Sequence, residues 1–345
     1  MFKCAMLGCG GRARGHADAY RYVKRGKLAA ICDLNETLLN RFGDAFNIDA
    51  RYTDLHEMLD KEKPDLLHIV TSPVGRETQK RLRVPLMRVA SAHHVPAVIV
   101  EKPIAVDGED WRELTQLSET TTTKFVVNTQ LHFHPKNLEL KRDVTAGKIG
   151  DVRLIEASAR LTLSGQGPHV LQLVSSYIDN APPVKVFGQV SGKQSLDSDH
   201  PAPDHAVASI TYQNGVRASV MFGTEAGPKI SHHDASHRHK RVAVFGTRGF
   251  VQWTMDNWER NTPMGGYESG PLDYGEQDVI AQGGLTEAVF DWLLDEKKTH
   301  PTHLKQSLIE FNLVLGIYQS GLTHAPVSLP CDPPDGIIDA LKARL

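Results

Sequence analysis

Cysteine is scarce in this chain, and the few cysteines form no recognisable metal or redox motif. Four cysteines, at positions 4, 9, 32 and 331, are spread over 345 residues without a CxxC pair. Cys4 and Cys32 fall in apolar runs, where a reduced thiol behaves as a small apolar group. We therefore expect a reduced, cytoplasmic protein.

Long hydrophobic stretches and clusters of basic residues are missing as well. No segment approaches the apolar length that spans a bilayer. The stretch MFKCAMLGCGGRARG lacks the apolar core and the cleavage site of a signal peptide. The formal net charge is -2, with no long basic run or basic–aromatic pattern. We therefore expect neither a nucleic acid nor a membrane as partner, and a small molecule as the ligand.

The first third of the chain alternates strand signals with helix signals. Short apolar runs predict strands, and stretches such as NETLLNRFGDAF and DLHEMLDKEK between them predict helices. The longer stretch 76–94 contains Pro85 and predicts a kinked helix or an extra turn. This alternation implies right-handed βαβ units and a parallel sheet. The predicted strands are Lys3–Leu7, Leu28–Cys32, Leu66–Val70, Ala97–Val100 and Phe125–Val127.

The pattern changes near residue 130 to strict alternation of apolar and polar side chains. In VRLIEASARLTL, residues 152–163, apolar positions recur every second residue up to Leu163, which is typical of a sheet with one buried face. HAVASITY, VRASVMF, RVAVFG and GFVQWTM predict further strands. The C-terminus returns to a helical stripe of apolar residues, namely Leu304, Leu308, Phe311, Leu315 and Tyr318.

A glycine-rich turn follows the first predicted strand and opens the first helix, as MLGCGGRARGH. Gly8 suits the tight turn, Gly10 allows close approach of a pyrophosphate, and Ala13 takes the third glycine position. The helix N-terminus supplies N–H groups and a dipole for the phosphates, and Arg12 and Arg14 could add contacts. The predicted cofactor-binding residues of this turn are Gly8, Gly10, Gly11, Arg12 and Ala13.

Asp33 ends the second predicted strand, 20 residues after Ala13. A carboxylate there suits the ribose hydroxyls of NAD and would repel the 2′-phosphate of NADP, so NAD is the expected cofactor. The alternative is an ordinary glycine-rich turn with a capping Asp.

These signals place the chain in the α/β class with about two domains. We expect an N-terminal Rossmann domain, a doubly wound parallel sheet, at residues 1–128. Residues 129–345 are expected to form an α+β domain for substrate binding and oligomerisation, with an open, mostly antiparallel sheet. The C-terminal helix could pack back on the Rossmann domain. The outer face of the second sheet carries Ser, Thr and Val rather than dense charge, which predicts a homodimer or homotetramer.

A strand without alternation, Val98-Ile99-Val100, breaks off into Glu101-Lys102-Pro103. Such a run predicts a parallel strand buried on both faces, and ligands of open α/β sheets bind beyond the carboxyl ends of such strands. Lys102, with Pro103 stiffening the turn behind it, is therefore a candidate site residue. The alternative is a solvated ion pair.

Together these motifs resemble the Gfo/Idh/MocA family of glucose-fructose oxidoreductase and inositol dehydrogenase relatives. The likeness is carried by GCGGRARGH, by VTSP at 70–73, by VEKPIA at 100–105 and by HFHPKNLELKRDVTAGKIGDVRLIEA at 132–157. VFGTRGFVQW and HPTHLKQSLIEFNLVLGIYQS fit as well. The resemblance covers nearly the whole chain.

The resemblance implies a role for each residue around the Glu-Lys-Pro turn, whose peptide bond before Pro is often cis in the family. Lys102 would hydrogen-bond the reacting hydroxyl and stabilise the negative charge that grows as hydride leaves. Glu101 would help to anchor the nicotinamide ribose, and Asn128 would lie near the nicotinamide. The residues implied to line the cofactor cleft are Thr71, Ser72 and Pro73.

The chain departs from the family pattern in LSGQGPHVLQLVSSYI, residues 163–178. His169 fits the family's catalytic His, but Gly165 stands where an Asp is usual, and Gln172 replaces a later acid. A catalytic His normally has a partner that fixes its tautomer. Either His169 acts as a lone base or another position supplies the acid, the candidates being Asp179, Asp204 and His205.

Other histidines are candidate substrate contacts. His132 stands where relatives often carry Arg, so His132 and His134 could face the pocket. In ISHHDASHRHK, residues 230–240, His233 and His237 are four apart, as on one face of a metal-binding helix, but a solvated loop has the same composition. We expect no metal. The predicted substrate residues are His132, His134, Gln172 and His205.

Three functions follow from these residues. The first is an NAD-dependent oxidoreductase acting on a sugar, a polyol or a sugar derivative, with Lys102 and His169 as catalytic residues. The second is a sugar lyase or glycosidase that oxidises its substrate transiently, eliminates and returns the hydride. The missing Asp and the extra histidines motivate it. The third is a nicotinamide-binding protein without catalysis.

Overall fold

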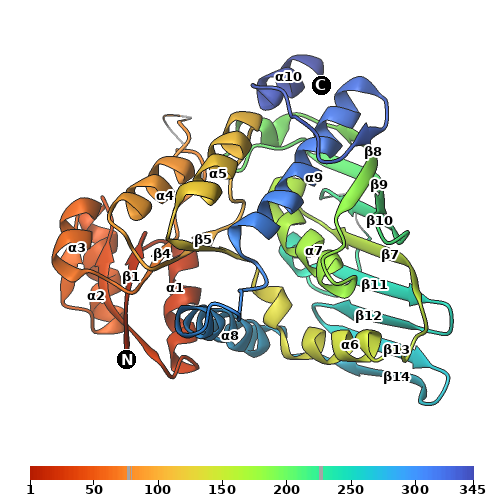
Figure 1. The fold of residues 1–345 in the computed structure, drawn as a ribbon, viewed down its shortest axis with the longest axis horizontal. Helices are drawn as coiled ribbons and strands as arrows, with labels where there is room; N and C mark the ends of the chain where they lie inside the picture. The colour runs from red at the N-terminus through yellow and green to blue at the C-terminus, as the bar shows by residue number, and fades with distance from the viewer. Residues whose placement is uncertain (76–77, 79, 225–227) are drawn as a thin grey trace. The chain divides into compact units, whose positions relative to one another are not determined.

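The computed structural model describes residues 1–75, 78, 80–224 and 228–345, which divide into two compact units. The first unit combines residues 1–105, 113–133 and 278–307, and the second combines 106–112, 134–277 and 308–345. The domain boundary expected after residue 128 stays a prediction. The α/β class is confirmed, with a parallel sheet in the first unit and a mostly antiparallel sheet in the second (Figure 1).

The first unit is built on a six-stranded sheet in the order β3-β2-β1-β4-β5-β6, and all of its pairings are parallel. All five predicted strands are present, and the residues of β4 and β5 are buried throughout, as expected for a sheet covered on both faces. The three residues of β3 were not predicted. The strands are β1 (Phe2–Leu7), β2 (Gly26–Cys32), β3 (Ala50–Tyr52), β4 (Leu66–Ile69), β5 (Ala97–Glu101) and β6 (Lys124–Asn128).

The helices of the first unit begin where side chains cap them. Asn35 accepts a hydrogen bond from the Leu38 N–H at 3.0 Å, and Asp54 accepts one from the Glu57 N–H at 2.9 Å. Residues 76, 77 and 79 of the predicted helical stretch 76–94 lie outside the described residues, and the helix itself covers 83–92. The helices are α1 (Gly11–Asp18), α2 (Glu36–Phe46), α3 (Leu55–Glu62), α4 (Arg83–Ala92) and α5 (Gly108–Thr120), the last beginning in the second unit.

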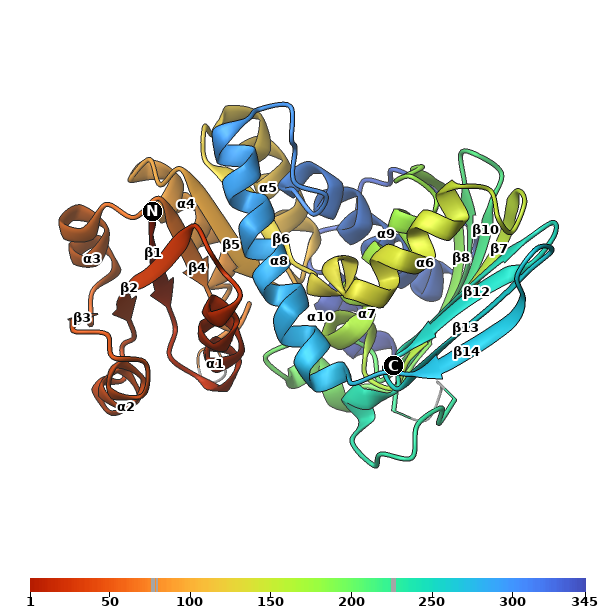
Figure 2. The ribbon, with the colours of Figure 1, turned by 90° about the horizontal axis from the view of Figure 1, so that it is seen from below.

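A late segment of the chain completes the first sheet. Right-handed crossovers place α1 and α2 on one face and α3, α4 and α5 on the other. This leaves β4, β5 and β6 bare on the first face, where α8 (Tyr274–Leu294) lies beside the sheet (Figure 2). Its side chains Leu285, Val289 and Phe290 join one buried apolar cluster with Cys4, Leu66, Ala97, Ile99 and Val126 of the sheet. Arg25 fixes this helix through Glu287 at 2.6 Å and Asp291 at 2.9 Å.

The edge strand β6 is covered by the residues that follow α8. Thr302 accepts a hydrogen bond from the Val127 N–H at 2.9 Å through its carbonyl, and its hydroxyl donates to the Val127 carbonyl at 2.7 Å. Beside it, His300 is fully buried, with Nε2 3.1 Å from the Leu285 carbonyl and Nδ1 3.2 Å from the Thr302 N–H. An edge covered in this way cannot pair with another chain.

The second unit is built on a nine-stranded sheet in the order β14-β13-β12-β11-β7-β10-β9-β8-β15, in which only β7 and β10 pair in parallel among the described residues. The predicted period-two strands are present. The strands are β7 (Val152–Ala159), β8 (Pro183–Ser191), β9 (His205–Tyr212), β10 (Arg217–Phe222), β11 (Arg241–Gly246), β12 (Phe250–Thr254), β13 (Asn257–Thr262), β14 (Gly266–Pro271) and β15 (Val327–Ser328).

The prediction that the strand continues to Leu163 was wrong at its C-terminal end. Strand β7 stops at Ala159, and Leu163 is the first residue of α7 (Leu163–Tyr177), capped by the Thr162 hydroxyl. Leu163 is fully buried, so its apolar side chain belongs to the helix face rather than to the sheet.

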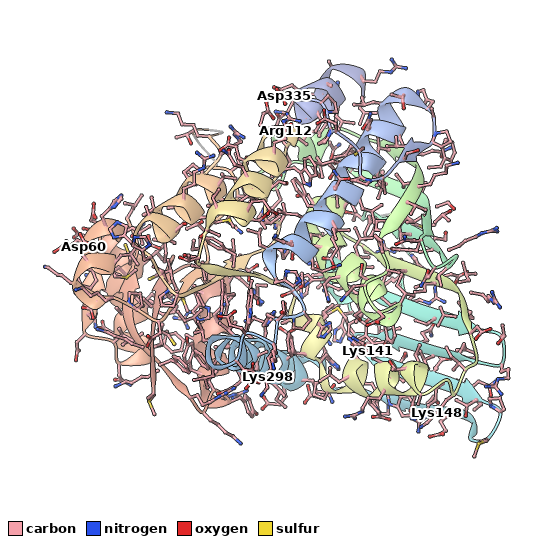
Figure 3. The ribbon with its side chains drawn as sticks, viewed as in Figure 1. Asp60, Arg112, Lys141, Lys148, Lys298 and Asp335 are labelled. Atoms are coloured by element: carbon pink, nitrogen blue, oxygen red, sulfur yellow. The ribbon has the colours of Figure 1, made fainter. Side chains whose placement is uncertain are left out.

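The remaining helices of the second unit are α6 (Pro135–Thr145), α9 (Leu304–Thr323), which starts in the first unit, and α10 (Ile337–Arg344). The predicted apolar stripe of α9 is confirmed, since all five of its residues are buried. Lys342 of α10 pairs with Asp197 at 3.0 Å. Arg112 pairs with Asp332 at 3.2 Å and also with Asp335 (Figure 3). No described helix is both long enough and apolar enough to cross a membrane.

His300 predicts a loss of stability in acid. Burial lowers the pKa of His300 to about 3, well below the value of about 6.5 in an unfolded chain. The unfolded state therefore binds the extra proton between these values, and stability falls by up to about 1.4 kcal/mol per pH unit as the pH drops below about 6.5. Thermal unfolding of the wild type and of His300→Asn at pH 7 and pH 5 measures this. We expect a smaller fall in Tm between the two pH values in the variant. An equal fall in both proteins would refute the assignment.

Candidate functional site

The glycine turn between β1 and α1 is shaped for close approach by a ligand. Gly8 has φ +100°, and a Cβ there would lie 2.6 Å from the Val70 carbonyl oxygen, so the turn requires glycine. Gly10 caps α1 without a side-chain hydrogen bond from the described residues. A Cβ on Gly10 or Gly11 would meet no described atom within 4 Å. The first N–H groups of α1 therefore border open space, which fits a phosphate group.

Asp33 holds this turn in place. Its Oδ2 accepts the Cys9 N–H at 2.7 Å, and its Oδ1 accepts the Asn35 N–H at 2.8 Å. A carboxylate has about four lone-pair sites, so the partly exposed Asp33 keeps acceptor capacity for ribose hydroxyls. The residue thus orders the turn, and its contact with a ribose stays a prediction.

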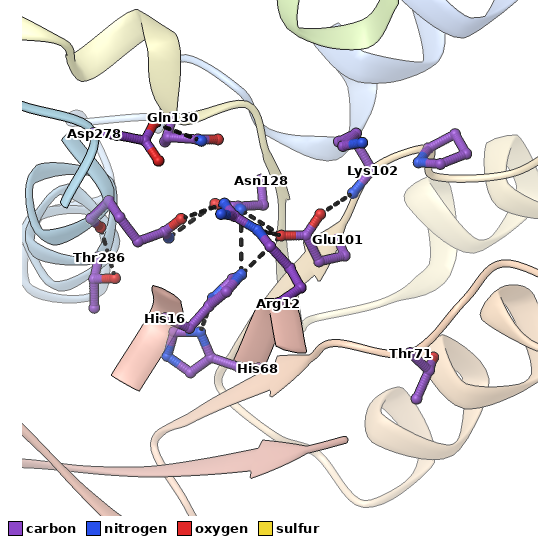
Figure 4. A network of polar contacts seen from close by, with 12 residues as sticks. Arg12, His16, His68, Thr71, Glu101, Lys102, Asn128, Gln130, Asp278 and Thr286 are labelled. Carbon is purple, nitrogen blue, oxygen red and sulfur yellow. Dashed lines mark hydrogen bonds and ion pairs between the residues drawn. The ribbon is translucent and has the colours of Figure 1, made fainter. Parts of the chain in front are cut away.

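Glu101, at the end of β5, is the centre of a buried polar network (Figure 4). Its Oε1 lies 2.7 Å from Arg12 Nε, 2.8 Å from His16 Nε2 and 2.7 Å from Asn128 Nδ2. Its Oε2 accepts the Lys102 N–H at 3.1 Å. The ion pair with Arg12 joins the Glu-Lys-Pro turn to the glycine turn, two motifs that are 89 residues apart.

Gln282 of α8 closes this network into a ring. Arg12 Nη2 donates to Gln282 Oε1 at 3.1 Å, Gln282 Nε2 donates to Asn128 Oδ1 at 2.9 Å, and the Asn128 amide donates to Glu101. Each of these three hydrogen bonds joins an N–H donor to an oxygen acceptor, which fixes the orientation of both amide groups. A ring of this kind is rigid because no member can turn alone.

A second branch of the network runs from Glu101 away from the turn. His16 Nδ1 lies 3.1 Å from His68 Nδ1, and His68 Nε2 lies 2.8 Å from the Tyr20 hydroxyl. Burial lowers the pKa of His16, and it lowers the pKa of His68 well below its usual value, so both rings are neutral at pH 7. Because Glu101 accepts from His16 Nε2, the other protons follow: His68 donates to His16, and Tyr20 donates to His68.

Glu101 remains charged despite its burial. Burial alone would raise its pKa, but the charge of Arg12 and the hydrogen bond from His16 hold the pKa well below its usual range. Lys102 shows the opposite balance: burial lowers its pKa, Glu101 raises it, and the charges of Arg12 and Arg83 lower it further. An ammonium group with a lowered pKa releases a proton more readily than an ordinary lysine does.

The segment after β4 carries the other residues expected in the cofactor cleft. The Thr71 hydroxyl is buried and has no hydrogen-bond partner among the described residues. The Pro73 carbonyl accepts the Leu82 N–H at 2.8 Å. The Lys102–Pro103 peptide is cis, as the resemblance implied. A buried hydroxyl without a partner is one that a bound ligand would satisfy, so the first unit fits a dinucleotide.

His169 and Gln172 lie on α7 of the second unit, where both are buried. The helix begins at Leu163 because the Thr162 hydroxyl accepts the Gly165 N–H at 3.1 Å. Gly165 lies one turn before His169, so this chain offers no carboxylate at the position where the family usually carries one. The catalytic role of His169 stays a prediction.

The histidines near residue 133 fall in different units. His132 lies in the short 3₁₀ helix Gln130–Phe133 of the first unit and is buried, with its ring 5.0 Å from that of Phe133. His134 caps α6, where its Nδ1 accepts the Lys136 N–H at 3.2 Å. Its ring packs edge-on against Trp253 and stacks with Tyr274. His134 therefore has a structural role, whatever it adds to substrate binding.

The candidates for a missing acid have different surroundings. Asp204 accepts the N–H groups of Gln194 at 3.0 Å and Ser195 at 2.8 Å, which assigns its carboxylate to a turn. His205 begins β9, and its Nδ1 is buried without a hydrogen-bond partner among the described residues. Asp179 follows α7 at a positive φ of 54°.

The histidine-rich loop does not form the helical pair that its spacing suggested. His237 lies in the three-residue 3₁₀ helix Ser236–Arg238, and His233 precedes it in irregular backbone. His232, His233 and Asp256 bring ligand atoms within 4.8 Å of one another. However, Arg238 Nη2 lies 2.9 Å from Asp256 Oδ1 and 3.2 Å from His233 Nε2. A guanidinium already bonded there opposes a metal ion.

Sequence reasoning missed His16, His68, Gln282 and Arg83. Two signals were available: His16 follows Arg12 by one helical turn, and His68 is the polar residue of an otherwise apolar strand. A polar side chain in a strand buried on both faces requires a hydrogen-bond partner. Gln282 and Arg83 gave no local signal.

Comparison with known proteins agrees with this geometry. Residues 2–129 match an oxidoreductase family described by its NAD-binding Rossmann fold. The chain is 29% identical over 240 residues to D-apiose dehydrogenase of Paraburkholderia graminis, an alignment that covers 64% of this chain and 60% of that one. It is 24% identical over 195 residues to myo-inositol 2-dehydrogenase of Thermotoga maritima, covering 56% and 51% of the two chains. The chain thus spans about half to three-fifths of the length of these relatives.

The fold also matches solved structures over nearly its full length. An oxidoreductase from Agrobacterium radiobacter, solved in complex with NAD+, L-tartaric acid and magnesium, aligns with a TM-score of 0.79 at 20% identity. The alignment covers 95% of this chain and 98% of that one. At this identity the likeness establishes the fold.

Glu101→Gln tests the network. The amide removes the charge that Arg12 pairs with and turns a donor toward other donors, so we expect a loss of stability on the order of 3 kcal/mol. Glu113→Gln is the matched control, because its exposed pairs with Arg81 at 3.4 Å and Arg88 at 2.9 Å contribute less than about 1 kcal/mol. Thermal unfolding monitored by circular dichroism measures both variants. Equal Tm values for the two would contradict the network's role.

Proposed function

We propose that this chain, whose residues 2–129 match the NAD-binding Rossmann domain of the Gfo/Idh/MocA oxidoreductase family, is an NAD-dependent dehydrogenase of a sugar, a polyol or a sugar derivative. The substrate would lose a hydride from a carbinol carbon and a proton from its hydroxyl. The names of the relatives, D-apiose dehydrogenase and myo-inositol 2-dehydrogenase, support this substrate class.

The observation that carries the proposal is the ion pair between Arg12 and Glu101 at 2.7 Å. It joins the turn suited to a dinucleotide phosphate with the turn that carries Lys102. A lysine beside the cofactor turn, at the carboxyl edge of a parallel sheet, stands where such sheets bind ligands.

NAD would be held by residues of the first unit. The N–H groups after Gly10 would bind the pyrophosphate, and Asp33 would accept hydrogen bonds from the adenosine ribose. Thr71, Ser72 and Pro73 would line the cleft, Glu101 would help to anchor the nicotinamide ribose, and Asn128 would lie near the nicotinamide. When bound, NAD supplies the hydride acceptor.

The chain's own residues would manage the proton and the charge. Lys102 would donate a hydrogen bond to the substrate oxygen and stabilise its developing negative charge. His169 would accept the hydroxyl proton, which leaves a carbonyl product two hydrogens lighter than the substrate. Gln172, His132, His134 and His205 would contribute to substrate binding.

The proposal extends to assembly and location. Val184 and Phe187 of β8 and Met221 of β10 expose apolar side chains, which supports a homodimer or homotetramer formed through this sheet. All four cysteines are free thiols, which supports a reducing, cytoplasmic location.

Lys102→Met tests the chemical role of the lysine. With a panel of sugars, inositols and glycosides, we expect NAD reduction to fall by a factor on the order of 1,000 because the charge-stabilising donor is lost. The dissociation constant for NAD, measured by calorimetry, should change only a few-fold. Lys61→Met, which removes an exposed lysine paired with Glu57, is the control.

Three outcomes separate the alternatives. Turnover at the wild-type rate in Lys102→Met would refute the proposal. Mass analysis that finds a cleaved or dehydrated product, with no reduced cofactor accumulating, would replace the dehydrogenase by the lyase or glycosidase that cycles NAD. Binding of NAD without reduction by any substrate would favour the non-catalytic protein.

Asp33→Asn tests cofactor choice. The amide keeps an oxygen for the Cys9 N–H and removes the charge that would repel a 2′-phosphate. We expect the ratio of kcat/KM for NADP to that for NAD to rise about tenfold, equivalent to about 1.4 kcal/mol. Asp44→Asn, at an exposed residue paired with Arg51, should leave the ratio unchanged. No change in Asp33→Asn would show that another group selects the cofactor.

A further inference from the structure

Arg83 is a buried cation that neither the glycine turn nor the Glu-Lys-Pro motif accounts for. It is the first residue of α4, and only 1% of its surface is exposed. Its Nη1 donates to the Pro103 carbonyl at 3.3 Å, and its Nη2 donates to the Thr71 carbonyl. Nε is buried and has no partner among the described residues.

This placement costs stability. Burial lowers the pKa of Arg83 to about 10, which reports the penalty of desolvating its charge. The residue also stands at the N-terminus of a helix, where the dipole disfavours a cation. Among the described residues, its hydrogen bonds go to carbonyl oxygens, which are weaker partners for a guanidinium than a bidentate carboxylate. An apolar side chain of similar length would fill the same space without these costs.

The two carbonyl groups show what the side chain achieves. Thr71 belongs to the loop that follows β4, and Pro103 directly follows Lys102. A planar guanidinium that donates to both carbonyl groups fixes the separation of these two loops. The loop after β4 is tied to the start of α4 a second time, since the Pro73 carbonyl accepts the Leu82 N–H. The turn of Lys102 is thereby tied to α4 through Arg83 and to the ring through Glu101.

We propose that Arg83 is a positioning residue for Lys102, which clamps the turn of Lys102 to the loop after β4 and holds its own positive charge beside the lysine. Among the described residues of the first unit, the charged groups that act on Lys102 include Glu101 of β5, Arg12 of α1 and Arg83 of α4. Arg12 forms an ion pair with Glu101, so these two charges act on the pKa of Lys102 in opposite directions. Arg83 has no carboxylate partner among the described residues, and its charge lowers the pKa of Lys102. Only the expected effect of Arg83 on turnover rests on the proposed function.

The test compares Arg83→Met, Arg83→Lys and a matched control. Arg83→Met removes both hydrogen bonds and the charge. Arg83→Lys keeps a charge but loses the planar fork that reaches both carbonyl groups. Arg88→Met is the control, since Arg88 lies on the same helix and pairs with Glu113 at the surface. The first readout is the titration of Lys102 in full-length protein labelled with 13C at the lysine ε carbons, assigned by comparison with Lys102→Arg.

We expect the Lys102 titration to move to higher pH in Arg83→Met, because a neighbouring positive charge is gone. It should stay near the wild-type value in Arg83→Lys and in Arg88→Met. The second readout is kcat for NAD reduction, which should fall on the order of 100-fold in both Arg83 variants. The dissociation constant for NAD should change little. A defect of folding alone would lower the amount of active protein without moving the titration of Lys102.

Wild-type titration and wild-type turnover in Arg83→Met would overturn the proposal. If Arg83→Met does not fold, Arg83→Lys decides, and unimpaired kcat in that variant would overturn the clamp. The titration needs no substrate. If the wild-type protein reduces NAD with none of the substrates tested, the proposed function is refuted. The titration of Lys102 in Arg83→Met would still support or overturn the role of Arg83.

Discussion

The buried negative charge of Glu101 is the constraint on which the first unit depends. A carboxylate at the end of a fully covered strand is stable only with donors on every side, and Glu101 receives them from α1, from β6 and from the turn that follows it. Gln282 extends the requirement to α8, since its amide links Arg12 to Asn128. A single charge therefore holds four segments that are distant in the sequence, α1, β5, β6 and α8, in fixed positions relative to one another. The same charge keeps the glycine turn and the lysine turn side by side, which is the geometry that a dinucleotide and its reacting partner need.

The region around Lys102 is balanced between opposite influences. Glu101 favours the charged ammonium, whereas burial and the cations of Arg12 and Arg83 favour the neutral amine. A lysine in such surroundings releases its proton more readily than an ordinary lysine does, and its charged form still donates hydrogen bonds. The neutral chain from His16 through His68 to Tyr20 adds no charge to this balance. Its protons all point toward Glu101, so it strengthens the anion without competing for the proton of the lysine.

Much of the fold and part of the candidate site could be predicted from the sequence because their signals are local. The five long strands of the first sheet, the glycine turn and the Glu-Lys-Pro turn each occupy a few consecutive residues. Strand β3 escaped prediction because three residues carry no periodicity, and β13 and β14 escaped because NWERNT and GYESGP lack an apolar face. Leu163 continued the alternation of a strand, yet the Thr162 cap turned it into a helix. Gln282 and Arg83 were out of reach, since each acts on residues that only the folded chain brings near.

The return of residues 278–307 to the first sheet has a consequence for biosynthesis. The ribosome synthesises β1 to β6 long before it synthesises α8. At that stage α8 does not yet cover the apolar face of the sheet, which is formed by Cys4, Leu66, Ala97, Ile99 and Val126. During that interval the nascent chain carries an exposed hydrophobic surface and a carboxylate, Glu101, whose ring of donors lacks Gln282. Such surfaces recruit chaperones or aggregate. Closure of the first unit must therefore be among the last events of folding, after most of the second unit has emerged.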